Sequence, residues 1–568
     1  MLLCCNALAG APPAGAIDPP AVDPGALPPD SPPGPMQPMR QTSYCTEVGV
    51  LPGTDFRVQP KYMDMLNLPE AWRFGRGGGV TVAVIDTGVT PHPRLPNLIG
   101  GGDYVMAGGD GLSDCDAHGT LVASLIAAAP DVGVPLPPPR QTRRPPSVPT
   151  NEPTPTPPTP QTTIIVQPPT IIAPPPPEET GPPPPPWMPQ PPAPQPPAPP
   201  PPGPAQGPAP GPAPGAGNTG RGTIRLPRYT GGARLTPVDR MPPKEPPPGP
   251  DAFSGVAPDV QVLSIRQSSQ AFGPKEPFAD RQDPQLREKT DGIRTMARAI
   301  VHAANMGASV INISEVICMN ARTVIEQADL GAAVRYAAVD KNAVVVVAAG
   351  DTSRRDCKQN PAYDPLQPGD PRDWKAVNTV VTPAWFSDYV LTVGAVDSAG
   401  APLDKTSVAG PWVSIAAPGT DIEGLSPFDD GLMNAVDGPE NSLLVPSGTG
   451  FSAAIVSGVA ALVRAKYPEL SAHQIINRLI RTARPPARGV DNQVGYGVVD
   501  PVAALTWDVP DGPVGPPERL SAPLAVPPMP PERDMTPIWV SGAGLLAAVL
   551  AAGVALGVAA MRRSWRQR

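Results

Sequence analysis

Two motifs in this 568-residue sequence hold residue types that can carry out acid–base chemistry. Asp86 directly follows Val80–Ile85, a β-branched run bounded by glycines, and His118 lies 32 residues further on. A carboxylate that orients an imidazole is the arrangement that activates a nucleophile in many hydrolases. Alone, the aspartate also fits a metal ligand or a helix cap, and a lone histidine is more often structural. The ordered pair favours catalysis.

The elements that must position this pair alternate between strand-like and helix-like patterns along the chain. This alternation predicts an α/β fold, in which a parallel sheet is covered by helices on both faces. Reactive groups in such a fold lie at the carboxyl ends of the strands. The predicted strands are Val80–Ile85, Val260–Ile265, Val310–Ile313, Ala343–Ala348, Val390–Val396 and Trp412–Ala416, and the predicted helices are Thr120–Ala129, Ile293–Met306, Leu330–Asp340 and Ser452–Lys466.

Several motifs occur in the order found in one superfamily. The sequence has VIDTG at 84–88, HGTLVA at 118–123 and GVAP at 255–258, and it resembles the subtilisin superfamily of serine proteases. The string DGLSDCDAHGT at 110–120, the four cysteines after residue 16 and a C-terminal apolar segment narrow the resemblance to the mycosins of type VII secretion systems. A proline-rich insertion after the histidine helix resembles the ESX-2 type. The resemblance implies a subtilisin-like sheet, with neither a cofactor nor a metal.

The family mechanism requires a serine nucleophile, a histidine base and an aspartate that holds the imidazole tautomer. The resemblance makes Asp86 the orienting acid and His118 the base. The nucleophile belongs in a G-T-S motif, but residues 448–458 read GTGFSAAIVSG, so Gly450 occupies its position. Ser452 lies two residues further along the helix, a rotation of about 200°, and its hydroxyl is expected on the opposite side.

Two further positions depart from the family pattern. The family places an asparagine after the A-A-G of the central strand, where its amide donates to the oxyanion, and this chain has Asp351. An ionised carboxylate has no donor, and loss of one such donor lowers turnover by about 10²–10³. Ser314-Glu315-Val316 also replaces the S-L-G-like edge of the first specificity pocket. The sequence therefore predicts a catalytically impaired protein.

Three functions are compatible with this pattern. The favoured one is a non-catalytic mycosin that serves as a structural component of the type VII secretion membrane complex. The alternative is an active serine endopeptidase that cleaves secreted substrates, in which Gly450 is an artefact. The third is an adaptor whose inactive domain presents its proline-rich insertion as a polyproline II spacer.

Composition separates this insertion from the globular sequence. Of the 93 prolines, 46 lie between Asp131 and Pro250. Proline removes amide donors, and the stretch has few large apolar side chains, so residues 131–252 are predicted to be a disordered insertion. The formal net charge of −8, without a basic stripe, argues against nucleic acid as a partner.

Both ends of the chain predict an exported, membrane-anchored protein. Residues 1–16 are apolar and end in Ala14-Gly15-Ala16, which predicts a signal peptide with a truncated start. Residues 538–561 form 24 uncharged positions followed by four arginines, which predicts one membrane span with a cytoplasmic tail at 562–568 and an extracytoplasmic main domain. The remaining predicted segments are an N-terminal extension (17–79) that stays attached, a subtilisin-like domain (80–508) and a proline-rich linker (509–537).

Four cysteines follow the predicted signal peptide and lack a metal-binding spacing, which favours disulfides. Four cysteines allow three pairings, and the spacing alone does not separate them. The resemblance to mycosins implies Cys45–Cys115 and Cys318–Cys357.

Overall fold

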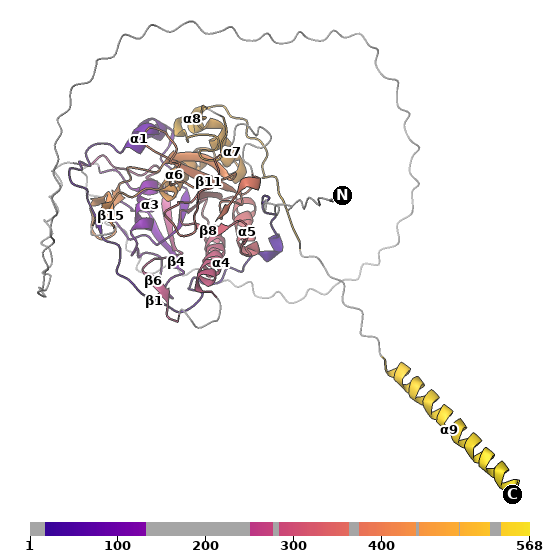
Figure 1. Ribbon diagram of the computed structural model, residues 1–568. Coiled ribbons are helices and arrows are strands. Elements are labelled where there is room, and N and C mark those ends of the chain that lie inside the picture. Colours follow the sequence, from indigo (N-terminus) through magenta and orange to yellow (C-terminus); the bar gives the residue numbers. More distant parts are fainter. Residues whose placement is uncertain are drawn as a thin grey trace, which may run out of the picture. The chain divides into compact units, whose positions relative to one another are not determined.

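The computed structural model describes seven stretches of the chain (Figure 1). These are residues 17–131, 250–276, 283–362, 374–438, 442–487, 489–522 and 535–567. The predicted signal peptide at 1–16 and residues 132–249 of the predicted insertion lie outside the described residues.

A seven-stranded parallel sheet forms the centre of the domain. Across the sheet, the strands are β12 (Val413–Pro418), β11 (Val390–Val396), β9 (Val344–Ala348), β7 (Val310–Ile313), β3 (Thr81–Asp86), β5 (Gln261–Arg266) and β4 (Leu98–Asp103). The chain adds β4 and β5 on one side of β3 and then continues with β7 on the other side. A reversal of this kind places a crevice at the carboxyl ends of the central strands.

Each face of the sheet packs on its own hydrophobic core. Along β9, Val344 and Val346 belong to one core, and Val345 and Val347 belong to the other, as the two-residue repeat of a strand requires. The first core holds the apolar faces of α3 (His118–Ala127), α6 (Thr449–Lys466) and α7 (Ala472–Thr482). The second holds those of α4 (Pro284–Asn305) and α5 (Ala328–Arg335). The α/β, subtilisin-like fold class predicted from the sequence is confirmed.

Shorter elements surround this sheet. They are the helices α1 (Lys61–Met65), α2 (Leu68–Ala71), α8 (Pro501–Thr506), η1 (Pro24–Ala26), η2 (Trp72–Phe74), η3 (Tyr336–Asp340) and η4 (Trp374–Ala376), and the strands β1 (Met39–Gln41), β2 (Val48–Gly49), β6 (Phe272–Pro274), β8 (Ile317–Asn320), β10 (Thr379–Thr382), β13 (Gly424–Leu425), β14 (Leu432–Met433), β15 (Ala435–Asp437) and β16 (Leu443–Leu444). Among the described residues, they pair as β1 with β6, β8 with β10, β13 with β14, and β15 with both β16 and β2.

The segments predicted to flank the domain pack against it. Val22 of the N-terminal extension is buried, and its backbone bonds to the segment around Leu520. The first part of the predicted linker is held by α7, because the side chains of Ser471 and Gln474 donate to the carbonyls of Val514 and Gly512. Residues 509–522 of the predicted proline-rich linker therefore contact the domain, which proline content alone does not indicate.

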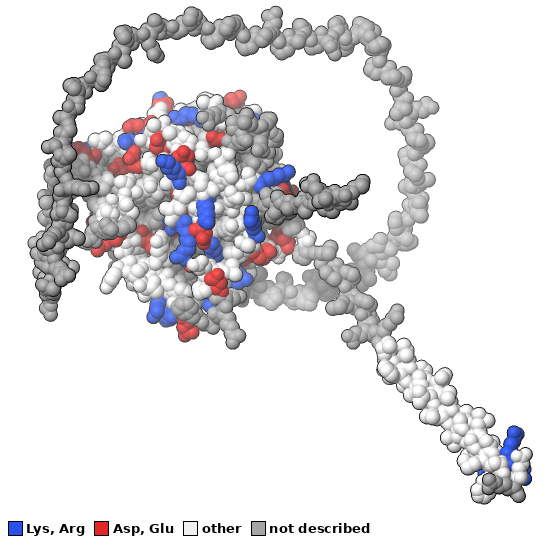
Figure 2. Space-filling view, in the orientation of Figure 1, with Lys and Arg blue, Asp and Glu red and all other residues white. Residues whose placement is uncertain are grey.

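The C-terminal helix α9 (Thr536–Arg566) contains the predicted span at 538–561. It is long and apolar enough to cross a membrane. Figure 2 shows its surface free of charge until the basic side chains at its end. These include Arg562, Arg563 and Arg566.

Candidate active site

Asp86 and His118 meet at the carboxyl edge of the sheet. Asp86 is the last residue of β3 and is fully buried, and His118 is the first residue of α3. The Nδ1 atom of His118 lies 2.8 Å from Asp86 Oδ1. A Cβ atom at Gly119 would lie 2.1 Å from the carbonyl oxygen of Gly88, so only glycine lets α3 begin this close to the aspartate. The pair has the geometry in which a carboxylate orients an imidazole.

A buried carboxylate that the sequence analysis missed, Asp114, connects the two halves of this pair. Its oxygens accept hydrogen bonds from the Thr87 hydroxyl and from the Thr120 backbone N–H, at 2.9 and 2.8 Å. The Thr87 hydroxyl in turn accepts from the Gly119 N–H at 2.9 Å. Burial raises the pKa of Asp114 to about 6. Its place in the DCDAH string was visible in the sequence, but its bond to Thr87 depends on the fold.

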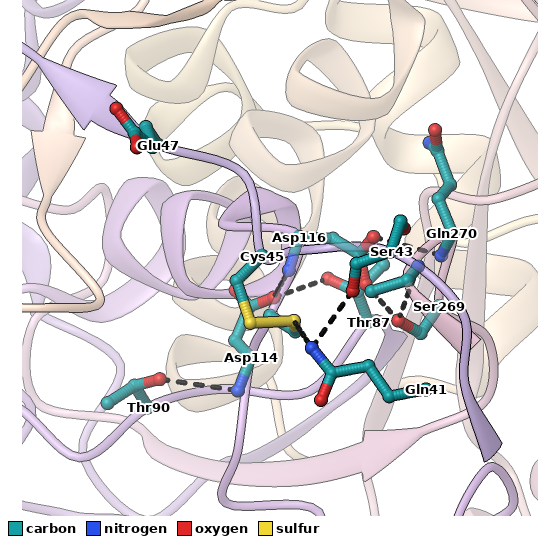
Figure 3. Close-up of a disulfide and its surroundings, with 12 residues drawn as sticks. Gln41, Ser43, Cys45, Glu47, Thr87, Thr90, Asp114, Asp116, Ser269 and Gln270 are labelled. Atoms are coloured by element: carbon teal, nitrogen blue, oxygen red, sulfur yellow. Dashed lines mark hydrogen bonds between the residues drawn. A yellow bond between two sulfur atoms is a disulfide. The ribbon is translucent and has the colours of Figure 1, made fainter. Parts of the chain in front are cut away.

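The first disulfide holds this loop from outside, as Figure 3 shows. Cys45 of the N-terminal extension is bonded to Cys115, between Asp114 and Asp116. Asp116 accepts hydrogen bonds from the Ser269 hydroxyl and the Gln270 N–H, which join the loop to the segment after β5. Cys318 and Cys357 form the second disulfide. Both pairings implied by the family resemblance are confirmed.

Gly450 stands where a side chain would face the histidine. It is the second residue of α6, and a Cβ atom built there would lie 3.3 Å from His118 Nε2 and 3.2 Å from the carbonyl oxygen of Ser314. Its φ lies outside the left-handed region, so the backbone does not require glycine. Ser452 is fully buried, and its hydroxyl donates to the carbonyls of Ala417 and Pro418, at 3.0 and 3.2 Å. Position 450 thus faces His118 and Ser314, whereas the Ser452 hydroxyl faces β12.

Asp351 lies just beyond the carboxyl end of β9 and contacts the start of α6. Its carboxylate accepts from the Thr449 hydroxyl at 3.0 Å and from the Thr449 N–H at 3.2 Å. A carboxylate at a helix N-terminus is favoured by the helix dipole and caps an unpaired N–H group. Burial raises the pKa of Asp351, although the Thr449 bonds oppose this shift. α6 consequently begins at Thr449, three residues before the predicted start.

A second ion pair borders the histidine. Glu315 Oε1 lies 3.7 Å from His118 Nδ1 and 2.5 Å from a guanidinium nitrogen of Arg354, a residue that the sequence analysis did not single out. Burial alone lowers the pKa of His118, but the charge and hydrogen bond of Asp86, followed by the charge of Glu315, outweigh burial and raise it to about 9.

Among the described residues, one group of side chains is spaced closely enough to hold a metal ion, and it consists of Asp86, His118 and Glu315. Asp86, His118 and Glu315 each place one ligand atom within 4.8 Å of the others. All three side chains are already engaged, because His118 Nδ1 contacts Asp86 Oδ1 and Glu315 Oε1 contacts Arg354. The arrangement is a chain of alternating charges that pairs these side chains with one another, although Asp86 Oδ2 has no hydrogen-bond partner among the described residues.

Comparison with known proteins shows to which family this chain is similar. The model of the subtilase family, Peptidase_S8, matches residues 77–135 and 232–497. Mycosin-5 of Mycobacterium tuberculosis (strain ATCC 25618 / H37Rv) is 68% identical, over 100% of this chain and 96% of that protein. Mycosin-2 of the same strain is 51% identical, over 98% of this chain and 96% of that protein.

Solved structures give the same result. A chain in the structure of an intact ESX-5 inner membrane complex is 60% identical, with a TM-score of 0.66, over 96% of this chain and 100% of that one. The crystal structure of MycP1 from Mycobacterium smegmatis is 39% identical, with a TM-score of 0.65, over 90% of this chain and 100% of that one. The finer assignment to the ESX-2 type stays a prediction. From its motifs, its sheet and these relatives, the chain belongs to the subtilase family and, within it, to the mycosins.

Proposed function

We propose that this mycosin is a catalytically impaired structural subunit of a type VII secretion membrane complex. The observation that carries the proposal is the built Cβ position at Gly450, which faces His118 Nε2 at 3.3 Å while the residue supplies no hydroxyl. The complex is proposed from the 60% identity to a chain of the ESX-5 inner membrane complex.

The departures from the family pattern act on different steps of the reaction. Without a serine, no acyl-enzyme forms, and in subtilisin the loss of the serine lowers turnover by about 10⁶. Asp351 places a carboxyl group, in place of an amide donor, at the position that the family pattern gives to the oxyanion, and its oxygens already accept from Thr449. These two defects are chemically independent, so the correction of one leaves the other in place.

The proposed location follows from helix α9 and its basic end. We place α9 across the membrane with its arginines on the cytoplasmic side, as the positive-inside rule requires. The folded domain then lies outside the cytoplasm, where the disulfides Cys45–Cys115 and Cys318–Cys357 persist.

The test separates catalysis from assembly in the full-length protein. A fluorophosphonate probe, which labels an activated serine, is expected to leave the unmodified chain unlabelled. In cells that lack the endogenous mycosin, His118→Ala is expected to restore complex assembly and secretion as well as the unmodified chain does. Truncation after residue 534 is expected to restore neither. Labelling at Ser452, or loss of secretion with His118→Ala, would refute the proposal.

One observation favours the second candidate, an active endopeptidase. The 2.8 Å contact between His118 and Asp86 is the one that a working protease needs. This candidate requires a serine codon at position 450 of the native gene, and a glycine codon there excludes it.

A further inference from the structure

A cavity of about 380 Å³ lies at the edge of the sheet opposite to Asp86 and His118. Its walls come from segments that precede strands: residues 78–80 before β3, Ser309 before β7 and Asn342 before β9. The strands are parallel, so these amino ends share the edge that faces away from the candidate active site. The end of α6 completes the wall with Arg464, Ala465 and the nearby Pro468.

Arg464 is a buried cation that has no acidic partner among the described residues. It is 7% exposed, and its guanidinium donates to the backbone carbonyls of Leu470 and Asn342, at 2.5 and 2.8 Å. Its Nε atom has no hydrogen-bond partner within the described stretches. A guanidinium has five N–H donors, so these two bonds leave three unused; the Nε donor is shielded from solvent, and the other two belong to the Nη atoms. Burial lowers the pKa of Arg464.

An uncompensated buried charge is unfavourable, and folded proteins normally pair such a group with an anion. A second cation lies at the same cavity. Lys341 is exposed, and its ammonium group lies 5.4 Å from the centre of the Tyr336 ring. The nearby Asp340 is already paired with Arg335. The cavity thus combines one buried and one exposed positive charge.

The remaining walls suit a compact polar ligand. They consist mainly of small residues that leave the backbone accessible, namely Gly78, Gly79, Ala304, Gly307, Ala308, Ser309 and Ala465. Large apolar side chains, which would favour an aromatic or acyl ligand, are missing from this lining. A phosphate group has several acceptor oxygens, and it matches the planar donors of an arginine together with the point charge of a lysine.

We propose that this cavity binds a phosphate group, supplied either by free inorganic phosphate or by a phospholipid headgroup. The anion contacts the remaining Nη donors of Arg464 and is closed in by Lys341. This site is separate from the Asp86–His118 pair. Phosphate binding there does not depend on whether the protein is catalytically active.

The experiment uses the full-length protein in a phosphate-free detergent. Inorganic phosphate is titrated against thermal unfolding, with sodium chloride holding the ionic strength constant. A ligand that binds the folded state raises the melting temperature in a concentration-dependent way. Lys341→Ala is expected to weaken the apparent affinity about tenfold. The matched control Lys405→Ala, an exposed lysine outside the cavity, is expected to leave the affinity unchanged.

Gly78→Asp blocks the site without removing the arginine. Gly78 lines the cavity, its φ is not left-handed, and a Cβ atom there has nothing within 4 Å. The introduced carboxylate is expected to pair with Arg464, raise the melting temperature without phosphate and abolish the response to phosphate. No response in the unmodified protein, or an unchanged response in Gly78→Asp, would overturn the proposal.

Repeating the titration in phosphatidylglycerol nanodiscs identifies the source. If the melting temperature of the unmodified protein no longer responds to phosphate in nanodiscs, and that of Gly78→Asp is the same in detergent and in lipid, the site binds the headgroup. A retained response assigns it to free phosphate.

Discussion

At the scale of single residues, position 450 determines which reaction the site can perform. The built Cβ at Gly450 lies within 3.4 Å of His118 Nε2 and of the Ser314 carbonyl oxygen, so a side chain fits only if its neighbours move by a few tenths of an ångström. The orienting contact between Asp86 and His118 does not depend on that side chain. We infer that the loss of catalytic activity comes from the missing hydroxyl at position 450 and from the carboxyl group of Asp351. The Asp86–His118 pair itself is preserved.

The first prediction restores the hydroxyl. Gly450→Ser is expected to give fluorophosphonate labelling at residue 450, because the new side chain faces His118 Nε2. The double variant Gly450→Ser/Asp351→Asn is expected to exceed the single one by about 10²-fold in turnover, since the amide donates where the carboxylate repels. Gly450→Ala, which adds the Cβ without the hydroxyl, is the matched control and is expected to stay unlabelled. Equal turnover in the single and double variants would contradict the role of Asp351.

The second prediction concerns pH. His118 has a folded pKa of about 9 against an ordinary value of 6.5. Its contribution to stability is therefore fully present below pH 6.5 and is lost as pH rises through 9, by an amount on the order of 1–3 kcal/mol. Denaturant unfolding at pH 7 and pH 9 measures this difference. The raised pKa of Asp114, about 6, acts mainly below this window, and that of Glu423, about 7, acts at its lower end.

The control for this pH dependence is His118→Asn, which keeps a polar side chain but does not titrate. The loss of stability between pH 7 and pH 9 is expected to shrink in this variant. An unchanged loss would show that other groups cause it.

The sequence motifs and the family resemblance were enough to bring Asp86, His118 and Gly450 together in one site, whereas their catalytic roles stay a prediction. The sequence motifs are local, and each follows or opens a recognisable element. Arg354 and Asp114 were not predicted, because their partners come from elements that only the folded sheet brings together. Arg354 pairs with Glu315 across 39 residues of sequence. Partners at that separation leave no periodic signal in a single sequence.

At the scale of elements, the start of α3 depends on the loop that the first disulfide holds. Cys45–Cys115 joins residues 70 apart, and Asp114 and Asp116 anchor the two sides of Cys115. Replacing both cysteines with alanine is expected to lower the free energy of unfolding by about 2–4 kcal/mol. Hydrogen exchange is expected to rise at residues 112–120.

The matched control is the alanine pair at Cys318 and Cys357, which joins residues 39 apart and lies outside this loop. It is expected to lower stability by a similar amount without faster exchange at 112–120. Faster exchange in both variants would mean that global unfolding, rather than the loop, causes the effect.

The strands with continuous β-branched runs were predicted closely, and β7 and β11 have the predicted bounds. β4 was missed because its sequence, LIGGGD, lacks that pattern. Its glycines have a packing cause: a Cβ atom at Gly101 would lie 2.7 Å from the side chain of Ile265. α7 was also missed, although Ser471 and Gln474 form a capping box at its start, a signal that the sequence contains.

At the scale of the whole molecule, the two segments that flank the sequence motifs pair with each other. The Val22 N–H donates to the Arg519 carbonyl and the Ser521 N–H donates to the Val22 carbonyl, both at 2.8 Å. Val22 is 1% exposed and belongs to the core on the α4 and α5 face. The N-terminal extension therefore holds the segment that leads toward α9.

The last prediction tests this pairing with Val22→Asp. A carboxylate at a buried site without a partner is unfavourable, so the extension is expected to detach locally and to release residues 511–522. Limited proteolysis and hydrogen exchange are expected to show faster cleavage and exchange in that segment, while the central sheet stays protected. Val58→Asp is the matched control, because Val58 is 68% exposed in the same extension. Unchanged protection of 511–522 in a folded Val22→Asp protein would contradict the pairing, and a native N-terminus near Gly79 would contradict an attached extension.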